Sequence, residues 1–446
     1  MRTLTTAVTL ALAGSALAYD PDNGDWSKDD PAHLRFMTWN VEDGICSTAT
    51  KTDAFNGWNA LARIVAAVKP DVLVLQETAD NSANGDVSGG SIDSVATMET
   101  VIELFIHGGN DPFRGGTVGS YVQMWDPGVD FPYVAVSPTD DGFNRNIVLS
   151  RYPFADINGS GQAITNNWFA IADAYSPGGG SGIRGFQFCE IDLPDEVYEG
   201  DLVAGNAHLK AGGDSSDLAD RLETAQNVAY YIDYHYNGAG TGVSDPNNRI
   251  FSAQPSSVLD ASDAIIWGGD WNEDESSNGR KGPAEWMTRA EMTGGTDGTD
   301  SDRSDSVYDS AAEHFTGNQD TRGSSKLDYI AWQDSVATPV HQVIVKTNTI
   351  QNNAYPPELA SFTVPSLLAG IAADHFAVWV DFELPLAETA VCPGDFNASE
   401  TVDSTDLAVL LAAWGNPHPT ADLDGSGSVD SADLAILLAA WGPCPE

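Results

Sequence analysis

Strand-like apolar segments along most of the chain carry a polar residue at one end. Residues 34–40 alternate apolar and polar side chains and finish at Asn40, and residues 72–77 are a buried-strand run that ends on the carboxylate of Glu77. Apolar residues at helical spacing lie between the two runs. Two strands joined through a helix therefore present an amide and a carboxylate at a sheet edge, where they suit metal coordination or catalysis. Taken singly, each is also compatible with a strand-end cap.

Later strand-like segments follow the same pattern. The polar residues at their ends are His208 after residues 201–207, Asp270 and Asn272 after residues 264–269, Asp328 within residues 326–330, and Asp374 with His375 within residues 373–378. A structural histidine remains the alternative interpretation for His208 and for His375. The recurrence predicts that side chains with acid–base or metal-binding chemistry gather at one edge of a sheet.

Seven motifs in this order resemble the endonuclease/exonuclease/phosphatase superfamily, whose fold is deoxyribonuclease I-like. They are Trp39-Asn40, Gln76-Glu77, Ser150-Arg151-Tyr152-Pro153, His208-Leu209, Gly269-Asp270-Trp271-Asn272, Leu327-Asp328-Tyr329-Ile330 and Asp374-His375. The resemblance covers roughly residues 34–383. It implies an α+β fold, a four-layer α/β/β/α sandwich of two mostly antiparallel sheets with helices outside.

The resemblance and the chemistry of phosphodiester hydrolysis together imply a role for each residue. The implied metal ligands are Glu77, Asn40 and Asp374, which suit Mg²⁺ or Mn²⁺ and also Ca²⁺. The implied catalytic residues are Asp270 for the attacking water, Asn272 and His208 for the phosphate oxygens, and Asp328 to orient His375, which contacts the phosphate or assists proton transfer.

The C-terminal part of the chain contains two copies of one pattern, and their offset is 27 residues. Oxygen-bearing residues occupy the loop positions that an EF-hand uses for calcium, with a main-chain carbonyl at position 7. In the first copy they are Asp395, Asn397, Ser399, Thr401, Asp403 and Asp406, and in the second copy Asp422, Asp424, Ser426, Ser428, Asp430 and Asp433. The pattern predicts two bound calcium ions.

This repeat resembles a type I dockerin. We expect a small all-α calcium-binding module over residues 392–446, joined to the larger domain by a linker over residues 384–391. The module has nine acidic residues and no Lys or Arg, so it should unfold without cations. The resemblance implies docking onto a cohesin-type partner on a scaffold or surface. A calcium-stabilised repeat without a partner is the alternative.

The four cysteines permit disulfides in an oxidising compartment. Cys392 and Cys444 bracket both repeats, where a disulfide would join the ends of the module. Cys46 and Cys189 are candidates for a second disulfide, although sequence alone does not show that they meet.

Residues 1–18 have the layout of a secretory signal peptide, with Arg2, a short apolar run and an Ala-Leu-Ala cleavage site. The large domain would then span residues 19–383. No later stretch is long and apolar enough for a membrane helix. We therefore expect a secreted protein.

The net charge of −45 bears on the substrate. Subtracting the module's −9 leaves −36 for residues 1–391, a surface that repels polyanions. A secreted nuclease is the leading hypothesis, with Arg145, Arg151, Lys210, Arg280 and Lys281 as candidates for a basic groove. The alternatives are a phosphoesterase of the sphingomyelinase or inositol-phosphate phosphatase kind and, from another class, a catalytically inactive binding scaffold.

Overall fold

The computed structural model describes most of the chain. The described residues are 19–45, 51–78, 93–138, 144–167, 186–236, 256–257, 259–275, 307–387, 392–397, 399, 401–418 and 420–444. The predicted signal peptide and Cys46 lie outside them. The chain divides into two compact units, Met1–Pro385 and Leu386–Glu446. Within the described residues, no helix is long and apolar enough to cross a membrane.

The first unit contains two six-stranded sheets. The first sheet has the order β11 (Thr338–Ile344), β12 (Val378–Glu383), β1 (Leu34–Asn40), β2 (Val72–Gln76), β4 (Ile147–Ser150) and β3 (Tyr133–Val136). The second has the order β5 (Ile164–Asn167), β6 (Phe186–Ile191), β7 (Leu202–His208), β8 (Ala264–Asp270), β10 (Asp328–Trp332) and β9 (Val307–Tyr308). Among the named strands that the structure describes in this unit, β1–β2 and β7–β8 pair in parallel and the other pairs are antiparallel.

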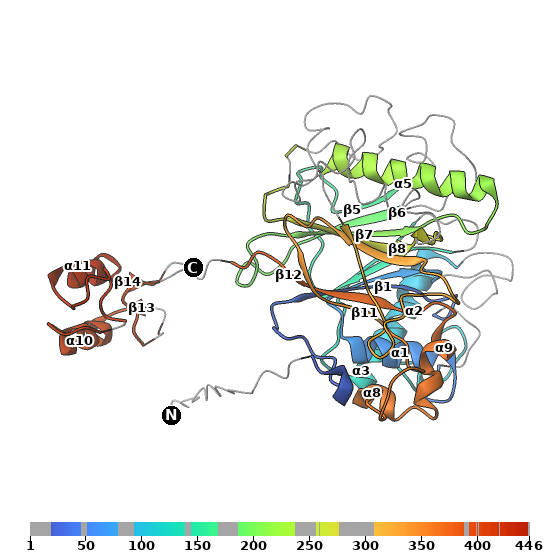
Figure 1. The fold of residues 1–446 in the computed structure, drawn as a ribbon, viewed down its shortest axis with the longest axis horizontal. Coiled ribbons are helices and arrows are strands. Elements are labelled where there is room, and N and C mark those ends of the chain that lie inside the picture. Colours follow the sequence, from blue (N-terminus) through green and yellow to red (C-terminus); the bar gives the residue numbers. More distant parts are fainter. Residues whose placement is uncertain are drawn as a thin grey trace. The chain divides into compact units, whose positions relative to one another are not determined.

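Helices cover the outer faces of both sheets (Figure 1). Against the first sheet lie α1 (Gly57–Val68), α2 (Val95–His107), α3 (Val122–Trp125), α8 (Pro357–Ala360) and α9 (Leu368–Ala372), and against the second lies α5 (Ser215–His235). The described residues also form two short 3-10 helices, η1 (Pro21–Asn23) and η2 (Pro365–Leu367). The predicted four-layer α/β/β/α sandwich is confirmed.

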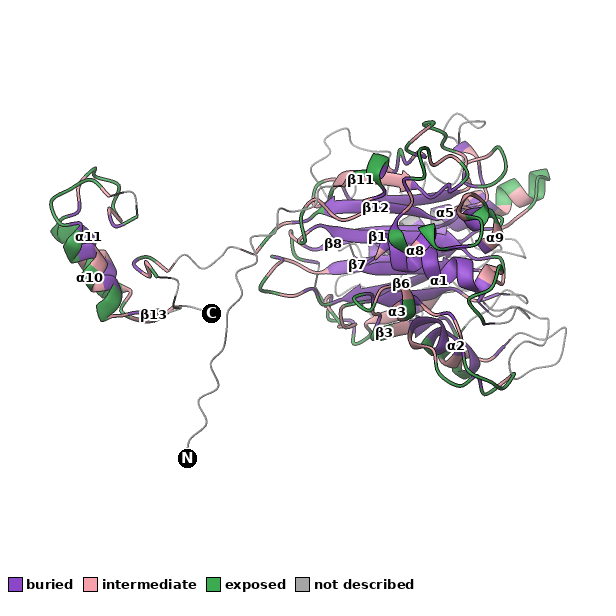
Figure 2. Cartoon of the chain, turned by 90° about the horizontal axis from the view of Figure 1, so that it is seen from below, coloured by how far each residue is buried: buried purple, intermediate pink, exposed green. Residues whose placement is uncertain are grey.

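Strand β1 shows why these residues form a doubly covered sheet. Leu34 and Phe36 point into the apolar core between the sheets, while Met37 and Trp39 point into the core under the helices. All seven residues of β1 are buried, and most of the central strands are buried along their length (Figure 2). Because side chains alternate between faces, the apolar residues of β1 enter both cores, and its buried polar residues Arg35, Thr38 and Asn40 have hydrogen-bond partners.

The second unit contains β13 (Thr401–Val402), α10 (Ser404–Ala412), α11 (Ser431–Ala439) and β14 (Gly442–Pro443). The first residues of α10 and α11 are fixed by reciprocal capping boxes, formed by Asp403 with Asp406 and by Asp430 with Asp433. The unit is not purely all-α as predicted, because β13 pairs with β14 near the chain end. A disulfide joins Cys392 to Cys444 and closes the unit.

The predicted disulfide between Cys46 and Cys189 is wrong. Cys189 is a free thiol with no solvent exposure. It lies on β6 and faces the apolar core between the sheets, where it packs as a small hydrophobic residue. Burial raises the pKa of the thiol, so the reactive thiolate form is suppressed.

A buried ion pair fastens β1 to β12 on the helix-covered side of the first sheet. Arg35 Nε donates to Asp381 Oδ1 at 2.6 Å, and Nη2 donates to Oδ2 at 2.7 Å. The guanidinium also lies 4.1 Å from the ring centroid of Trp379. Every oxygen of the carboxylate therefore has a cationic donor, which is the arrangement that makes a buried pair tolerable.

Asp381→Ala should lower the free energy of unfolding by about 3–5 kcal/mol, because it leaves the Arg35 charge buried without its partner. Chemical denaturation followed by tryptophan fluorescence measures this. The exposed Glu196→Ala variant is the matched control and should differ from the native chain by less than about 0.5 kcal/mol. Equal stability of both variants would contradict the assignment.

Candidate active site

Strand ends from both sheets meet at one edge of the sandwich. In the first sheet Asn40 is the register partner of Gln76, and Glu77 follows at once. In the second sheet Asp270 is the partner of His208 on one side and of Asp328 on the other. The parallel pairs β1–β2 and β7–β8 therefore deliver their carboxyl-terminal residues to the same place.

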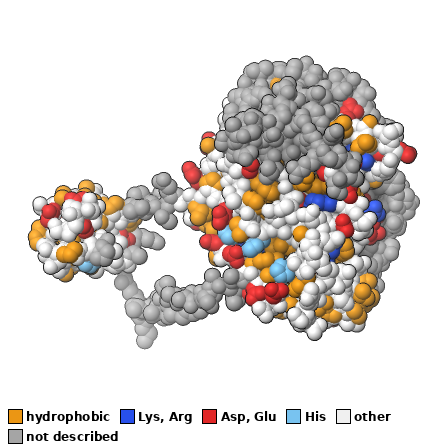
Figure 3. Space-filling model, in the orientation of Figure 1, with side chains coloured by type: hydrophobic (Ala, Val, Ile, Leu, Met, Phe, Trp, Pro, Cys, Tyr) orange, Lys and Arg blue, Asp and Glu red, His pale blue; other side chains and the backbone are white. Residues whose placement is uncertain are grey.

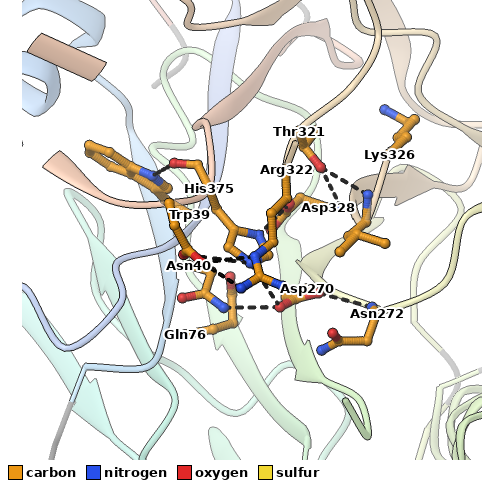
Figure 4. Close-up of polar contacts among 12 residues, drawn as sticks. Trp39, Asn40, Gln76, Asp270, Asn272, Thr321, Arg322, Lys326, Asp328 and His375 are labelled. Carbon is orange, nitrogen blue, oxygen red and sulfur yellow. Dashed lines mark hydrogen bonds and ion pairs between the residues drawn. The ribbon is translucent and has the colours of Figure 1, made fainter. Parts of the chain in front are cut away.

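Asp270 lies at the centre of these residues (Figure 4). Its Oδ2 accepts a hydrogen bond from Asn40 Nδ2 at 2.9 Å, which links the two sheets directly. His208 Nε2 lies 3.5 Å from the same oxygen and 3.5 Å from Glu77 Oε1. Burial and the negative charge of Asp328 raise the pKa of Asp270. The site therefore holds a buried carboxylate whose charge the described residues only partly neutralise.

Asp328 and His375 form a buried pair. His375 Nδ1 lies 2.8 Å from Asp328 Oδ2, and the indole of Trp39 donates to the main-chain oxygen of His375 at 3.0 Å. Burial lowers the pKa of His375, but the charge of Asp328 and its hydrogen bond outweigh burial and raise it overall. The carboxylate thus assigns the proton to Nδ1 and directs Nε2 toward Asp270 Oδ2, 3.7 Å away.

Two of the site residues predicted from the sequence have positive backbone φ angles, which side chains other than glycine adopt only rarely. Glu77 has φ of 53° and Asn272 has φ of 52°. Asn272 is held there by its own N–H, which donates to Asp270 Oδ1 at 2.9 Å, and by its amide, which donates to Leu209 O at 3.1 Å. Such conformations cost about 1–3 kcal/mol each and cluster at functional sites.

Asp374 reaches the same edge with a partner that the sequence did not predict. Its Oδ2 accepts from Arg322 Nε at 2.8 Å and from Nη2 at 2.6 Å, and its Oδ1 lies 3.9 Å from His375 Nε2. Its backbone N–H donates to Glu42 Oε2 at 2.8 Å. Burial and the charges of Asp374 and Glu77 raise the pKa of Glu42, so three carboxylates are close together here.

Sequence reasoning missed Glu42 and Arg322. Both lie in polar loops without strand or helix periodicity, and the only signal was proximity, two residues after Asn40 and six before Asp328. It also missed Thr321, whose hydroxyl accepts from the N–H groups of Leu327 and Asp328 and fixes the start of β10.

The basic residues expected in a groove are mostly engaged elsewhere. Arg151 pairs with Asp71 at 3.0 Å at the opposite end of β2, so its assignment to the groove is wrong. Arg145 donates to main-chain oxygens, and Lys210 Nζ lies 3.1 Å from Asp217. Arg280 and Lys281 lie outside the described residues. On the face drawn in Figure 3, the described surface shows scattered rather than continuous basic side chains.

The second unit holds a separate set of converging oxygens. Oxygens of Asp422, Asp424 and Asp433 lie within 4.8 Å of one another. Asp433 Oδ1 accepts from the N–H groups of Leu423 at 2.6 Å and Asp424 at 3.0 Å. In the first copy of the repeat, Asp406 and Asp395 likewise accept main-chain N–H groups of their loop.

The family model described as the dockerin type I domain matches residues 393–440. Residues 393–440 are a dockerin type I domain. No curated protein matches the chain. The predicted resemblance of the repeat is therefore confirmed.

Solved structures are similar to the chain over 79% of its length. An endonuclease/exonuclease/phosphatase from Beutenbergia cavernae DSM 12333 has 16% identity, a TM-score of 0.42 and 72% of its own chain covered. A family protein from Leptotrichia buccalis C-1013-b has 14% identity, a TM-score of 0.43 and full coverage. D. rerio TDP2 complexed with single-strand DNA product has 13% identity, a TM-score of 0.39 and full coverage. The chemistry of this chain has to be derived from its own residues.

Asp328→Asn should lower the pKa of His375, because it removes the charge that opposes the effect of burial. Titration of the His375 imidazole by NMR measures this. Asp29→Asn is the matched control, since Asp29 pairs with His341 at 2.7 Å and should leave His375 unchanged. An unaltered His375 titration in Asp328→Asn would show that the pair does not govern the histidine.

Proposed function

We propose that the large domain is a metal-dependent phosphoesterase of the endonuclease/exonuclease/phosphatase superfamily that hydrolyses phosphodiester bonds. The observation that carries the proposal is the meeting of Glu77, His208 and Asp270, whose ligand atoms lie within 4.8 Å of one another although they come from two sheets. The seven ordered motifs support it independently, because each contributes a residue to this edge except the Ser150–Pro153 turn.

The residues fit a hard divalent cation. The carboxylates of Glu42, Glu77 and Asp374 raise local negative charge, and the donors are carboxylate and amide oxygens. We assign Glu77, Asn40 and Asp374 to a Mg²⁺ or Mn²⁺ ion, with Ca²⁺ as the further candidate. Such an ion would neutralise charge on the substrate phosphate and polarise its P–O bond.

The remaining site residues are assigned to proton transfer and to stabilisation of the charge that develops on the phosphate. Asp270 orients the attacking water and accepts its proton, which suits a carboxylate whose pKa is raised. His208 and Asn272 donate hydrogen bonds to the phosphoryl oxygens as negative charge develops there. The raised pKa of His375 favours its doubly protonated imidazolium, which Asp328 orients through Nδ1 so that Nε2–H faces the phosphate and assists departure of the leaving group.

The sequence makes a nucleic acid the leading hypothesis for the substrate, but we favour a small or lipid phosphodiester over it. The charge of −36 on residues 1–391 repels a polyanion, and Arg145, Arg151 and Lys210 are engaged with protein groups. Arg322 is compatible with either substrate. Its side chain is 51% exposed beside Asp374 and His375, where its charge would attract any phosphodiester.

We propose further that the protein is secreted and that its dockerin domain binds calcium and docks onto a cohesin-type partner. The converging oxygens of Asp422, Asp424 and Asp433 support calcium binding. Exposed apolar side chains on the domain, Leu411, Trp414, Leu438 and Trp441, support docking, since the two pairs occupy equivalent positions in the repeat.

Asp270→Asn should reduce the metal-dependent hydrolysis of bis-p-nitrophenyl phosphate by about 10²–10⁴-fold, because the water loses its base. The matched control is Asp260→Asn, an exposed residue just before the opposite end of β8, which should retain the native rate. Equal and measurable rates in the native chain and Asp270→Asn would contradict the role of Asp270, and no hydrolysis by either would support the inactive binding scaffold.

A further inference from the structure

A loop in the large domain, residues 156–162, folds around its own side-chain oxygens. Asp156 Oδ1 accepts from Ser160 N at 2.9 Å, and Asp156 Oδ2 accepts from Gly161 N at 2.8 Å. Asn158 Oδ1 accepts from Ser160 N at 3.1 Å, and Ser160 Oγ donates to Gln162 O at 3.2 Å. Four potential ligand oxygens, from a carboxylate, an amide, a hydroxyl and a main-chain carbonyl, therefore lie at alternate positions 1, 3, 5 and 7 of this loop.

The second calcium loop of the dockerin domain has the same hydrogen bonds at the same positions. Ser426 N donates to Asp422 Oδ1 at 3.0 Å and to Asp424 Oδ1 at 3.0 Å, Gly427 N donates to Asp422 Oδ2 at 2.7 Å, and Ser426 Oγ donates to Ser428 O at 3.2 Å. Position 6 is a glycine with positive φ in both loops, 81° in the large domain and 96° in the dockerin domain.

Glu190 on β6 takes the place that position 12 has in the dockerin loop. Its Oε2 accepts from Ile157 N at 2.7 Å and Asn158 N at 3.4 Å, the N–H groups of positions 2 and 3. In the dockerin domain Asp433 accepts from positions 2 and 3 in the same way. In the large domain this carboxylate therefore comes from a strand, and Glu190 follows the last loop residue, Gln162, by 28 residues.

The second carboxylate oxygen of Glu190 accepts no hydrogen bond from the described residues. Glu190 is 1% exposed, and its Oε1 makes no hydrogen bond to any part of the chain that the structure describes. Burial and the charge of Asp156 raise the pKa of Glu190 to about 7, although the two N–H groups act against this. A buried carboxylate oxygen beside a second carboxylate is costly unless a cation lies between them.

The orientation of Asn158 is fixed by a contact outside the loop. Asn158 is fully buried, and its amide nitrogen donates to His235 O at the end of α5 at 3.3 Å. The nitrogen is therefore turned away and the oxygen faces the loop. The loop, β6 and the last turn of α5 are tied together at this point.

We propose that these residues form a calcium site in the large domain, separate from the dockerin loops. Its ligands are the carboxylates of Asp156 and Glu190, Asn158 Oδ1, Ser160 Oγ and the main-chain oxygen of Gln162. Two carboxylates balance the charge of one Ca²⁺, and with Glu190 bidentate the oxygens reach the six that calcium requires. The proposal does not depend on the phosphoesterase activity.

The site is structural rather than catalytic. Glu190 pairs with Val203 of β7, five residues before His208, so the site lies roughly 17 Å along the strand from the catalytic edge. The calcium ion would hold the 156–162 loop against β6 and the end of α5. Its loss should therefore lower the stability of the large domain.

Calcium stoichiometry of the chain, measured by titration calorimetry after removal of residues 1–18, tests the site. Asp156→Asn, an exposed and nearly isosteric change, should bind one calcium ion fewer than the native chain. The matched control is Asp422→Asn at position 1 of the second dockerin loop, and the double variant should lose both ions. An Asp156→Asn variant that binds as many ions as the native chain overturns the proposal, whether or not the dockerin loops bind calcium.

Thermal unfolding of Glu190→Gln separates a ligand from a packing residue. In calcium at about 100 times Kd, the native large domain should unfold roughly 5 °C above the variant. In EDTA the unfolding temperatures of the native chain and the variant should become equal or change order, because the neutral amide of the variant removes a buried charge. Equal destabilisation of Glu190→Gln in calcium and in EDTA would show a packing role only and overturn the proposal.

Discussion

The sheet edge that carries the candidate active site depends on the close approach of the two sheets at Gly268. A Cβ atom on Gly268 of β8 would lie 2.8 Å from Thr38 Cβ and 3.2 Å from the ring of Phe36 on β1. Side chains two residues apart on a strand share a face. Two residues beyond this contact, Asn40 therefore meets Asp270, and the hydrogen bond between them joins the sheets at the site. A larger residue at position 268 would separate the layers and break that geometry.

The close approach of the sheets buries two carboxylates near each other. Asp270 and Asp328 lie on adjacent strands, and the described residues that accompany Asp270 include His208, His375 and Asn40. The raised pKa values of Asp270 and His375 are two consequences of this crowding. The carboxylates of Glu42, Glu77 and Asp374 extend this crowding of negative charge toward the surface. The divalent cation that we propose would offset this excess of negative charge.

The sequence predicted the parts of the site that follow strands. Asn40, Glu77, His208 and Asp270 could be found because an apolar run ends on each, and parallel pairing then brings the ends together. Arg322 and Glu42 could not, because loop side chains have no periodicity and their partners lie far along the chain.

The carboxylate of Glu190 shows the same limit. The 156–162 loop follows a calcium pattern, but its last carboxylate comes from another strand, and only the fold brings the two together. Cys189, its neighbour, faces the opposite side of β6 and lies in the core, so cysteine count alone gave the wrong pairing.

The most direct test of the central claim is a substrate panel across Mg²⁺, Mn²⁺ and Ca²⁺, with EDTA as the control. DNA, RNA, sphingomyelin, an inositol phosphate and bis-p-nitrophenyl phosphate would each be incubated with the native chain. The proposed site predicts hydrolysis of at least one phosphodiester with a divalent ion and none in EDTA. Failure to cleave any of them with any of the three ions, or equal cleavage in EDTA, would contradict it.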